Sequence, residues 1–372
     1  MVSSEYSNLG QSASFNKRLR AWFIDNGFSR TSRNRARNHI ESGRGINQLA
    51  VSSRATDKAE AELPLLEKHR VSIVNYLSPH FPSRLKNIED APLQLFVKGN
   101  LPESNLENHR AVVAIVGTRQ ADNFGKCLSS GLARELRRNG VQVVSGLARG
   151  IDGAAHRGAL CDLTSLIDRL TGPGIACLGG GVLRVYPREN QNIADQLVAE
   201  GGALISEYGL FEAPRKHQFP ERNRIISGLA DLVVVVQADL KSGSMITANL
   251  AAEQGREVAV FPGRVNEKLA AGTLELARNG ATLVRSCDEI LEILNLEPLP
   301  SKSKIEPELS NFKRRVINFV AESGSVHFDQ IVSTFSEDLE VCYRVLGELE
   351  LSGWLVQEPG DFYASGTKAA SL

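Results

Sequence analysis

The residues best suited to chemistry in this sequence are glycines, serines and basic residues that follow short apolar runs. They occur in five segments, at 117–119, 145–152, 179–190, 216–224 and 241–247. Glycine allows close backbone approach to a ligand, and the start of a following helix offers free N–H groups to a phosphate. One such segment alone is equally typical of a tight turn. Five together predict a phosphate-binding surface.

The candidate binding residues combine positive charge with backbone donors, hydroxyl groups and one aromatic ring. A chain with no net charge that gathers so many cations in these segments favours a groove for a long polyanion over a pocket for one phosphate ester. The flat ring of Phe219 could stack on a base. The candidates are Gly117, Thr118, Arg119, Gly146, Arg149, Gly150, Lys216, Phe219, Arg222, Asn223, Arg224, Lys241, Ser242, Gly243, Ser244 and Thr247.

Alternating strands and helices must position these segments. Short apolar runs rich in β-branched residues predict strands, and apolar residues at helical spacing between them predict helices. Repeated units of this kind predict an α/β fold with a doubly wound, mostly parallel sheet, whose ligands bind beyond the carboxyl ends of the strands. The expected strands are 112–116, 141–144, 175–178, 203–206, 232–236 and 258–261, with a last strand and helix within 281–294.

Length and composition set the class of protein. The chain has 372 residues, enough for two or three domains, and its 43 basic residues balance 43 acidic ones, which excludes a uniform polycation. The five cysteines form no C-x-x-C pair, so neither a zinc site nor a disulfide framework is expected. The sequence shows no membrane span and no signal-peptide pattern. We therefore expect a cytoplasmic protein with no metal and no cofactor.

The two ends of the chain differ in charge. Residues 1–60 hold ten basic and five acidic residues, a net charge of +5, whereas residues 305–365 hold four basic and eleven acidic residues, a net charge of −7. We expect a small basic helical region at 1–69, a Rossmann-like domain at 70–295 with an inserted helical extension at 161–174, a linker at 296–304, an acidic winged helix at 305–365 and a tail at 366–372. The acidic field predicts that the winged helix contacts protein and not DNA.

Sequence motifs give little support to an enzyme. The G-x-G-x-x-G fingerprint of dinucleotide-binding enzymes, the Walker P-loop, H-E-x-x-H and G-x-S-x-G are all missing. The best remaining catalytic constellation is Asp152 with His156 four residues later, together with Glu207 after a strand. A helical pair of this kind is more often a cap and a helix-face contact.

Six ordered motifs give the chain a resemblance to a known family. They begin at Val113, Val144, Tyr186, Phe219, Ser242 and Val260, and the series from about Tyr76 to Leu294 resembles the DNA-processing protein A family, called DprA or Smf. The resemblance implies an extended Rossmann fold and a homodimer, formed through the Rossmann domain, that binds single-stranded DNA without sequence specificity. It implies protection of that DNA and loading of the RecA recombinase during natural transformation, without enzymatic activity. It also implies a sterile-alpha-motif-like N-terminal domain, of which residues 1–69 are a reduced form.

Two departures from the family pattern fall near the first loop. Asp122 stands where a serine or threonine is usual, and its carboxylate would repel phosphate. Gln237 replaces the glutamate that normally ends its strand. A second hypothesis also stays open, a nucleotide-processing enzyme of the related phosphoribohydrolase-like group that uses a carboxylate such as Glu207.

Overall fold

The structure is a computed structural model that describes residues 2–42, 48–101, 111–161, 172–299, 310–335, 338–351 and 353–366. It divides into two compact units, Met1–Leu299 and Pro300–Leu372. Most of the predicted insertion, residues 162–171, lies outside the described residues. Within the described part, no helix is long and apolar enough to span a membrane.

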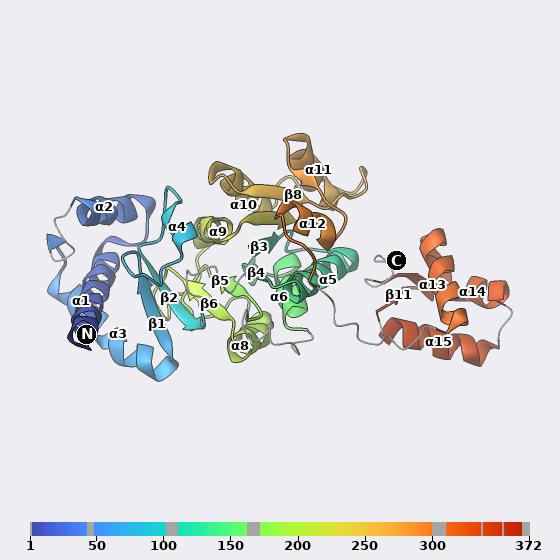
Figure 1. Ribbon diagram of the computed structural model, residues 1–372, viewed down its shortest axis with the longest axis horizontal. Helices are drawn as coiled ribbons and strands as arrows, with labels where there is room; N and C mark the ends of the chain where they lie inside the picture. The colour runs from blue at the N-terminus through green and yellow to red at the C-terminus, as the bar shows by residue number, and fades with distance from the viewer. Residues whose placement is uncertain are drawn as a thin grey trace. The chain divides into compact units, whose positions relative to one another are not determined.

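The first unit is built on one large sheet (Figure 1). Its strand order is β1-β2-β6-β5-β4-β3-β7-β8-β9 among the residues described. The strands from β3 to β9 pair in parallel, as predicted, and Val113 of β3 lies opposite both Val143 of β4 and Leu232 of β7. The bounds are β1 Val71–Asn75, β2 Gln94–Gly99, β3 Ala111–Val116, β4 Val141–Ser145, β5 Ile175–Cys177, β6 Ala203–Ser206, β7 Leu232–Val235, β8 Glu257–Val260 and β9 Thr282–Leu283.

No strand was expected before β3, but in the structure β2 pairs antiparallel with β6, and β1 pairs antiparallel with β2. The signal was present in the alternating valines and isoleucine of Val71–Asn75. The mixed sheet is therefore wider than the predicted parallel core.

Helices cover both faces of the sheet. On one face, Ile225 of α9 and Ala251 of α10 pack on the strands together with side chains of α4 and α11. On the other face, Leu136 of α5, Ile151 of α6 and Ile290 of α12 do the same. The bounds are α4 Ser83–Lys86, α5 Asn123–Arg138, α6 Ile151–Ala159, η3 Arg188–Asn190, α8 Gln191–Ala199, α9 Gln218–Leu229, α10 Gly243–Glu253, η4 Lys268–Ala270, α11 Ala271–Arg278 and α12 Cys287–Ile293.

Three helices at the N-terminus belong to the same unit: α1 Val2–Asn26, α2 Arg30–Glu41 and α3 Ser53–His69 (blue in Figure 1). Leu19, Trp22 and Phe23 of α1 are buried with Leu93, which lies just before β2. The apolar side of α1 therefore packs on the rest of the unit and not only on its neighbouring helices.

The second unit consists of α13 Asn311–Ser323, β10 Ser325–His327, α14 Phe328–Phe335, α15 Leu339–Leu351, β11 Leu355–Glu358 and β12 Phe362–Ser365. The three strands form an antiparallel sheet in the order β10-β12-β11. Val316, Ile331, Leu346 and Trp354 pack together beneath it. Three helices followed by such a hairpin have the arrangement of a winged helix.

Candidate nucleic-acid interface

The predicted binding segments follow the carboxyl ends of strands β3 to β7. Because these strands are parallel, their following loops lie along one edge of the sheet. The chain runs from β3 outward to β6 and then returns to β7 on the other side of β3. Doubly wound sheets bind ligands at the crevice that such a reversal creates. The first and the last candidate segments, which follow β3 and β7, therefore flank the crevice.

Backbone contacts lock the first loops together. The Thr118 N–H donates to the Gln237 carbonyl at 2.8 Å, and the Thr118 carbonyl accepts from the Ile151 N–H at 3.3 Å. Gly150 has a φ of 72°, and a Cβ at this position would collide with the Thr118 carbonyl. Glycine is therefore required where the β3 and β4 loops cross. The Thr118 N–H is occupied within the protein, and the Thr118 hydroxyl oxygen accepts the Gln120 N–H at 3.2 Å, so a ligand would meet the hydroxyl as a donor.

Arg119 and Phe219 meet at the surface. The Arg119 guanidinium carbon lies 4.9 Å from the centre of the Phe219 ring, and the ring also packs beside Gly179. Tyr186 lies on another side of Phe219, with ring centres 5.7 Å apart, and it is 50% exposed. A guanidinium over an aromatic ring can contact a phosphate while the rings contact a base.

Tyr186, the first residue of one of the six sequence motifs, is a further candidate contact that was not among the predicted binding residues. The sequence feature that could have identified it is an aromatic residue directly before a proline, in a loop at the sheet edge and outside the apolar core. Only the structure shows that its ring lies beside Phe219.

Two exposed lysines extend the positive surface. Lys216 and Lys241 form no ion pair with any residue that the structure describes. Ser242 caps α10 and its hydroxyl lies 2.8 Å from that of Ser244. Asn223 donates to the Gly243 carbonyl at 3.4 Å and so links α9 to the start of α10. Thr247 and Ser244 are buried, whereas Gly243 is exposed.

Asp122 and Gln237 lie together. The Asp122 carboxylate caps α5 by accepting the Gly125 N–H at 2.7 Å, and both of its oxygens accept from the Gln237 amide at 3.0 Å. A glutamate at position 237 could not donate these bonds and would face another carboxylate. The two departures from the family pattern are thus complementary, because the Gln237 amide donates to the Asp122 carboxylate. These neutral N–H donors partly compensate the negative charge of Asp122.

Arg149 forms an exposed ion pair in this structure. Its Nε and Nη2 atoms donate to the two Glu189 oxygens at 2.9 and 3.0 Å. The Glu189 carboxylate therefore competes with any phosphate for the Nε and Nη2 atoms of Arg149.

The structure places Arg222 beneath the surface, which differs from the expectation that it lines the groove. Its side chain is buried, and its Nη1 atom donates to the Gly146 carbonyl at 2.8 Å and to the Cys177 carbonyl. Burial lowers the pKa of Arg222 and raises that of the nearby Asp152, whose carboxylate accepts the Gly146 N–H at 3.1 Å. Arg222 supports the Gly146 loop from below.

Arg224 is likewise buried, in a network of four charged side chains. Its Nη2 atom donates to both Glu207 oxygens at 2.9 and 2.8 Å, and its Nε donates to Asp90 at 3.1 Å. Arg33 of α2 donates to Asp90 at 2.8 Å and lies 3.4 Å from Glu207. Burial alone would raise the pKa of Asp90, but the bonds from Arg33 and Arg224 hold it below its usual value. The network joins the N-terminal helices to α9 and the end of β6.

The same burial removes the predicted catalytic constellation from solvent. Glu207 is 1% exposed and held by two arginines, and His156 is fully buried, where burial lowers its pKa to about 3. Asp152 is 7% exposed beneath the Gly146 loop. Among the described residues, no group of His, Cys, Asp and Glu is arranged to hold a metal ion. Nothing in this geometry favours the nucleotide-processing hypothesis.

Comparisons with known proteins agree with the motifs. A family model described as DNA recombination-mediator protein A matches residues 72–295. Protein Smf of Escherichia coli is 36% identical over 310 residues, which cover 82% of this chain and 80% of that protein. DNA processing protein DprA of Bacillus subtilis is 40% identical over 224 residues, covering 60% of this chain and 71% of that protein.

Solved structures resemble this chain at similar identity. The crystal structure of DNA processing protein A from Streptococcus pneumoniae matches with a TM-score of 0.59 and 30% identity, covering 74% of this chain and 95% of that one. The structure of the Helicobacter pylori protein, described for its single-stranded DNA binding mode, matches with a TM-score of 0.52 and 31% identity, covering 61% of this chain and 96% of that one.

Proposed function

This chain belongs to the DNA recombination-mediator protein A family, and on that premise we propose that it binds single-stranded DNA along the β3 to β7 loop edge, without sequence specificity. The observation that carries the proposal is the contact of Arg119 with the Phe219 ring, near the exposed Lys216, which forms no ion pair with the described residues. A cation beside an aromatic ring binds a strand through its phosphates and through base stacking, and every base has a face to stack.

In this proposal, some loops bind the phosphates of the strand and others contact its bases. The Gly117–Arg119 turn, the loop from Gly146 to Gly150, and the start of α10 would hold phosphates. Phe219 and Tyr186 would stack on bases, and Lys216 and Lys241 would add charge. Arg222, Asn223 and Arg224 would act from beneath by fixing the positions of these loops.

The cellular role that we propose follows from the resemblance to the family. We propose that the chain protects incoming single strands in the cytoplasm and helps load RecA recombinase onto them during natural transformation, as a homodimer and without catalysis. A dimer through the Rossmann domain is supported by apolar side chains that are exposed around the β7 to β9 end of the sheet, namely Leu240, Ile246, Val265 and Leu283. A loading assay, in which RecA displaces a single-strand-binding protein, tests this step.

The primary test is a fluorescence-anisotropy titration of labelled oligo-dT and of its duplex across a salt series. We expect preference for the single strand and a log Kd that rises steeply with log salt. The double variant Lys216→Ala with Phe219→Ala should lose most of the binding. A salt-independent affinity, or equal binding by the double variant, would refute the proposal.

A further inference from the structure

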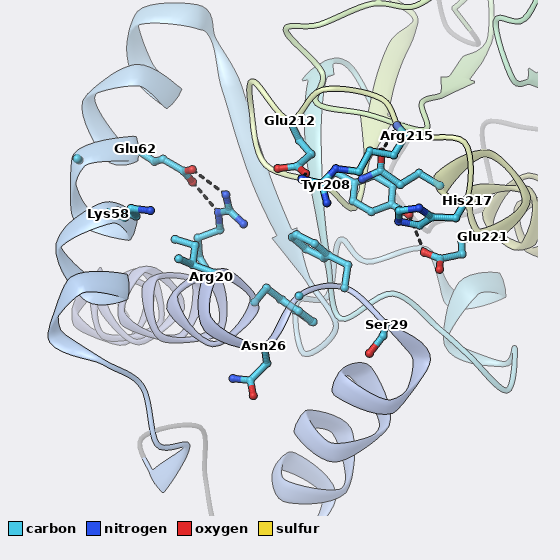
Figure 2. Close-up of a pocket in the computed structure, with 16 residues that line it drawn as sticks. Arg20, Asn26, Ser29, Lys58, Glu62, Tyr208, Glu212, Arg215, His217 and Glu221 are labelled. Carbon is cyan, nitrogen blue, oxygen red and sulfur yellow. Dashed lines mark hydrogen bonds and ion pairs between the residues drawn. The ribbon is translucent and has the colours of Figure 1, made fainter.

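A cavity of about 860 Å³ lies between the N-terminal helices and the segment from Tyr208 to Glu221. Figure 2 shows Arg20 and Glu62 on the helical side, and Tyr208, His217 and Glu221 on the side of the sheet. All of these residues belong to the first unit. The cavity plays no part in the loop edge described above.

The cavity and the loop edge share one short segment of chain. Arg215, His217 and Gln218 line the cavity. Phe219 instead contacts Arg119 and Gly179, and the exposed Lys216 does not line the cavity. Gln218 and Phe219 are consecutive residues, so the cavity and the loop edge adjoin along this segment.

The charges lining the cavity cancel. Arginine and lysine side chains from Arg20, Lys58 and Arg215 are matched by the carboxylates of Glu62, Glu212 and Glu221. Such a lining gives no net attraction for a phosphate. It offers both donors and acceptors, and Phe23, Ile24 and Phe28 add an apolar wall. This combination suits a flat, uncharged and polar group, which is the description of a nucleobase.

The Arg20 guanidinium is a hydrogen-bond donor at the cavity, fixed by an ion pair that uses two of its three nitrogen atoms. The Arg20 side chain is 9% exposed, and its Nε and Nη2 atoms donate to Glu62 at 2.6 and 2.7 Å. Its Cζ lies 5.7 Å from the centre of the Phe28 ring and 5.6 Å from that of Phe96. Within the described residues, Nη1 makes no hydrogen bond. The guanidinium is thus fixed with one nitrogen left to donate.

One acceptor faces the same cavity. The Tyr208 hydroxyl donates to Oε2 of Glu221 at 2.9 Å, which fixes the carboxylate, and Oε1 accepts no bond from the residues described. Guanine presents two adjacent N–H donors that suit a carboxylate such as that of Glu221, whereas thymine presents a single N–H donor.

We propose that this cavity is a base subsite of the DNA-binding surface, which takes one base of the bound single strand and favours guanine over thymine. The inference rests on the proposed function, because the strand must first bind along the loop edge. It adds a local base preference to a groove that is otherwise tolerant of sequence.

The test compares a 20-nucleotide oligo-dT with the same oligonucleotide carrying isolated dG residues at every fifth position. We expect wild type to bind the dG-containing strand about fivefold or more tightly. Ala61 lines the cavity from α3, so Ala61→Trp should fill the space and remove this preference while oligo-dT affinity stays within about twofold. Leu63→Trp is the matched control, because Leu63 is 41% exposed on the same helix and does not line the cavity.

A second variant tests the chemistry without filling the space. Glu221→Gln keeps the size of the side chain and an acceptor for the Tyr208 hydroxyl, but removes the carboxylate. It should also lose the preference for dG and keep its affinity for oligo-dT.

The outcomes separate this inference from the proposed function. Equal wild-type affinity for both oligonucleotides, with steep salt dependence, would overturn the base subsite and leave the single-strand proposal standing. A dG preference that survives Ala61→Trp would also overturn the subsite, because the preference would then arise elsewhere. If wild type binds neither oligonucleotide, the proposed function fails and the subsite fails with it.

Discussion

Replacing Phe219 with leucine isolates the contribution of base stacking to DNA binding. Leucine keeps an apolar side chain beside Gly179 and Tyr186, so the fold of the loop edge should persist, but it has no π face. The loss of affinity should therefore report stacking and not a collapsed loop.

The structure sets the size of the effect. Stacking of a base on an aromatic side chain contributes about 1–3 kcal/mol. Arg119 lies over the Phe219 ring at 4.9 Å and Tyr186 lies at 5.7 Å, so the ring has room for one base at most. We expect a loss near the lower limit, about 1–1.5 kcal/mol, which corresponds to an increase in Kd of about five- to twelvefold.

The assay is the oligo-dT anisotropy titration, with thermal unfolding as a check on folding. Because Phe219→Leu changes no charge, the slope of log Kd against log salt should stay the same as in wild type. Phe211→Leu is the matched control, since Phe211 is 49% exposed and contacts His69 instead of the loop edge. An unchanged Kd for a folded Phe219→Leu protein, or an equal loss in the Phe211 control, would refute the stacking argument.

Three further predictions concern charge and domain organisation. Glu189→Gln should release Arg149 from its ion pair, tighten oligo-dT binding about twofold and steepen the salt slope by about 0.7; an unchanged slope would show that Arg149 does not reach the strand. Asp90→Asn should lower the free energy of unfolding in urea by about 3–5 kcal/mol, since it leaves two buried arginines to share the single carboxylate of Glu207. Because the pKa of Asp90 is lower in the folded protein, its contribution is complete above its unfolded pKa and is lost as pH falls, so stability of the variant should depend less on pH between about 5 and 3. Removal of residues 300–372 should leave oligo-dT affinity within about twofold, because the acidic unit offers phosphates no attraction; a tenfold loss would contradict this.

The sheet edge could be predicted from the sequence because its signals are local. Each central strand is an apolar, β-branched run, and each following loop begins with glycine or serine. Parallel connectivity then requires that these loops share one edge. The expected strands 141–144 and 232–236 each differ by one residue from the observed bounds of β4 and β7.

Whether each basic side chain is buried or exposed could not be predicted, because the groups that it contacts are distant in sequence. Arg222 and Arg224 are two residues apart on α9, and both resemble exposed groove residues in sequence. Their partners are backbone carbonyls 45 and 76 residues away, and carboxylates 17 and 134 residues away. Similarly, nothing local indicates that Gln237 reaches Asp122, which lies 115 residues away.

The buried network of Arg33, Asp90, Glu207 and Arg224 has a consequence for how this protein can be divided. A fragment that begins after α3 would lack Arg33 and leave Asp90 and Glu207 with one arginine between them, inside the protein. The N-terminal helices are therefore not an accessory that can be removed or exchanged at will. In expression design, and in any recombination between related genes, the N-terminal helices and the sheet should therefore be kept together as one piece.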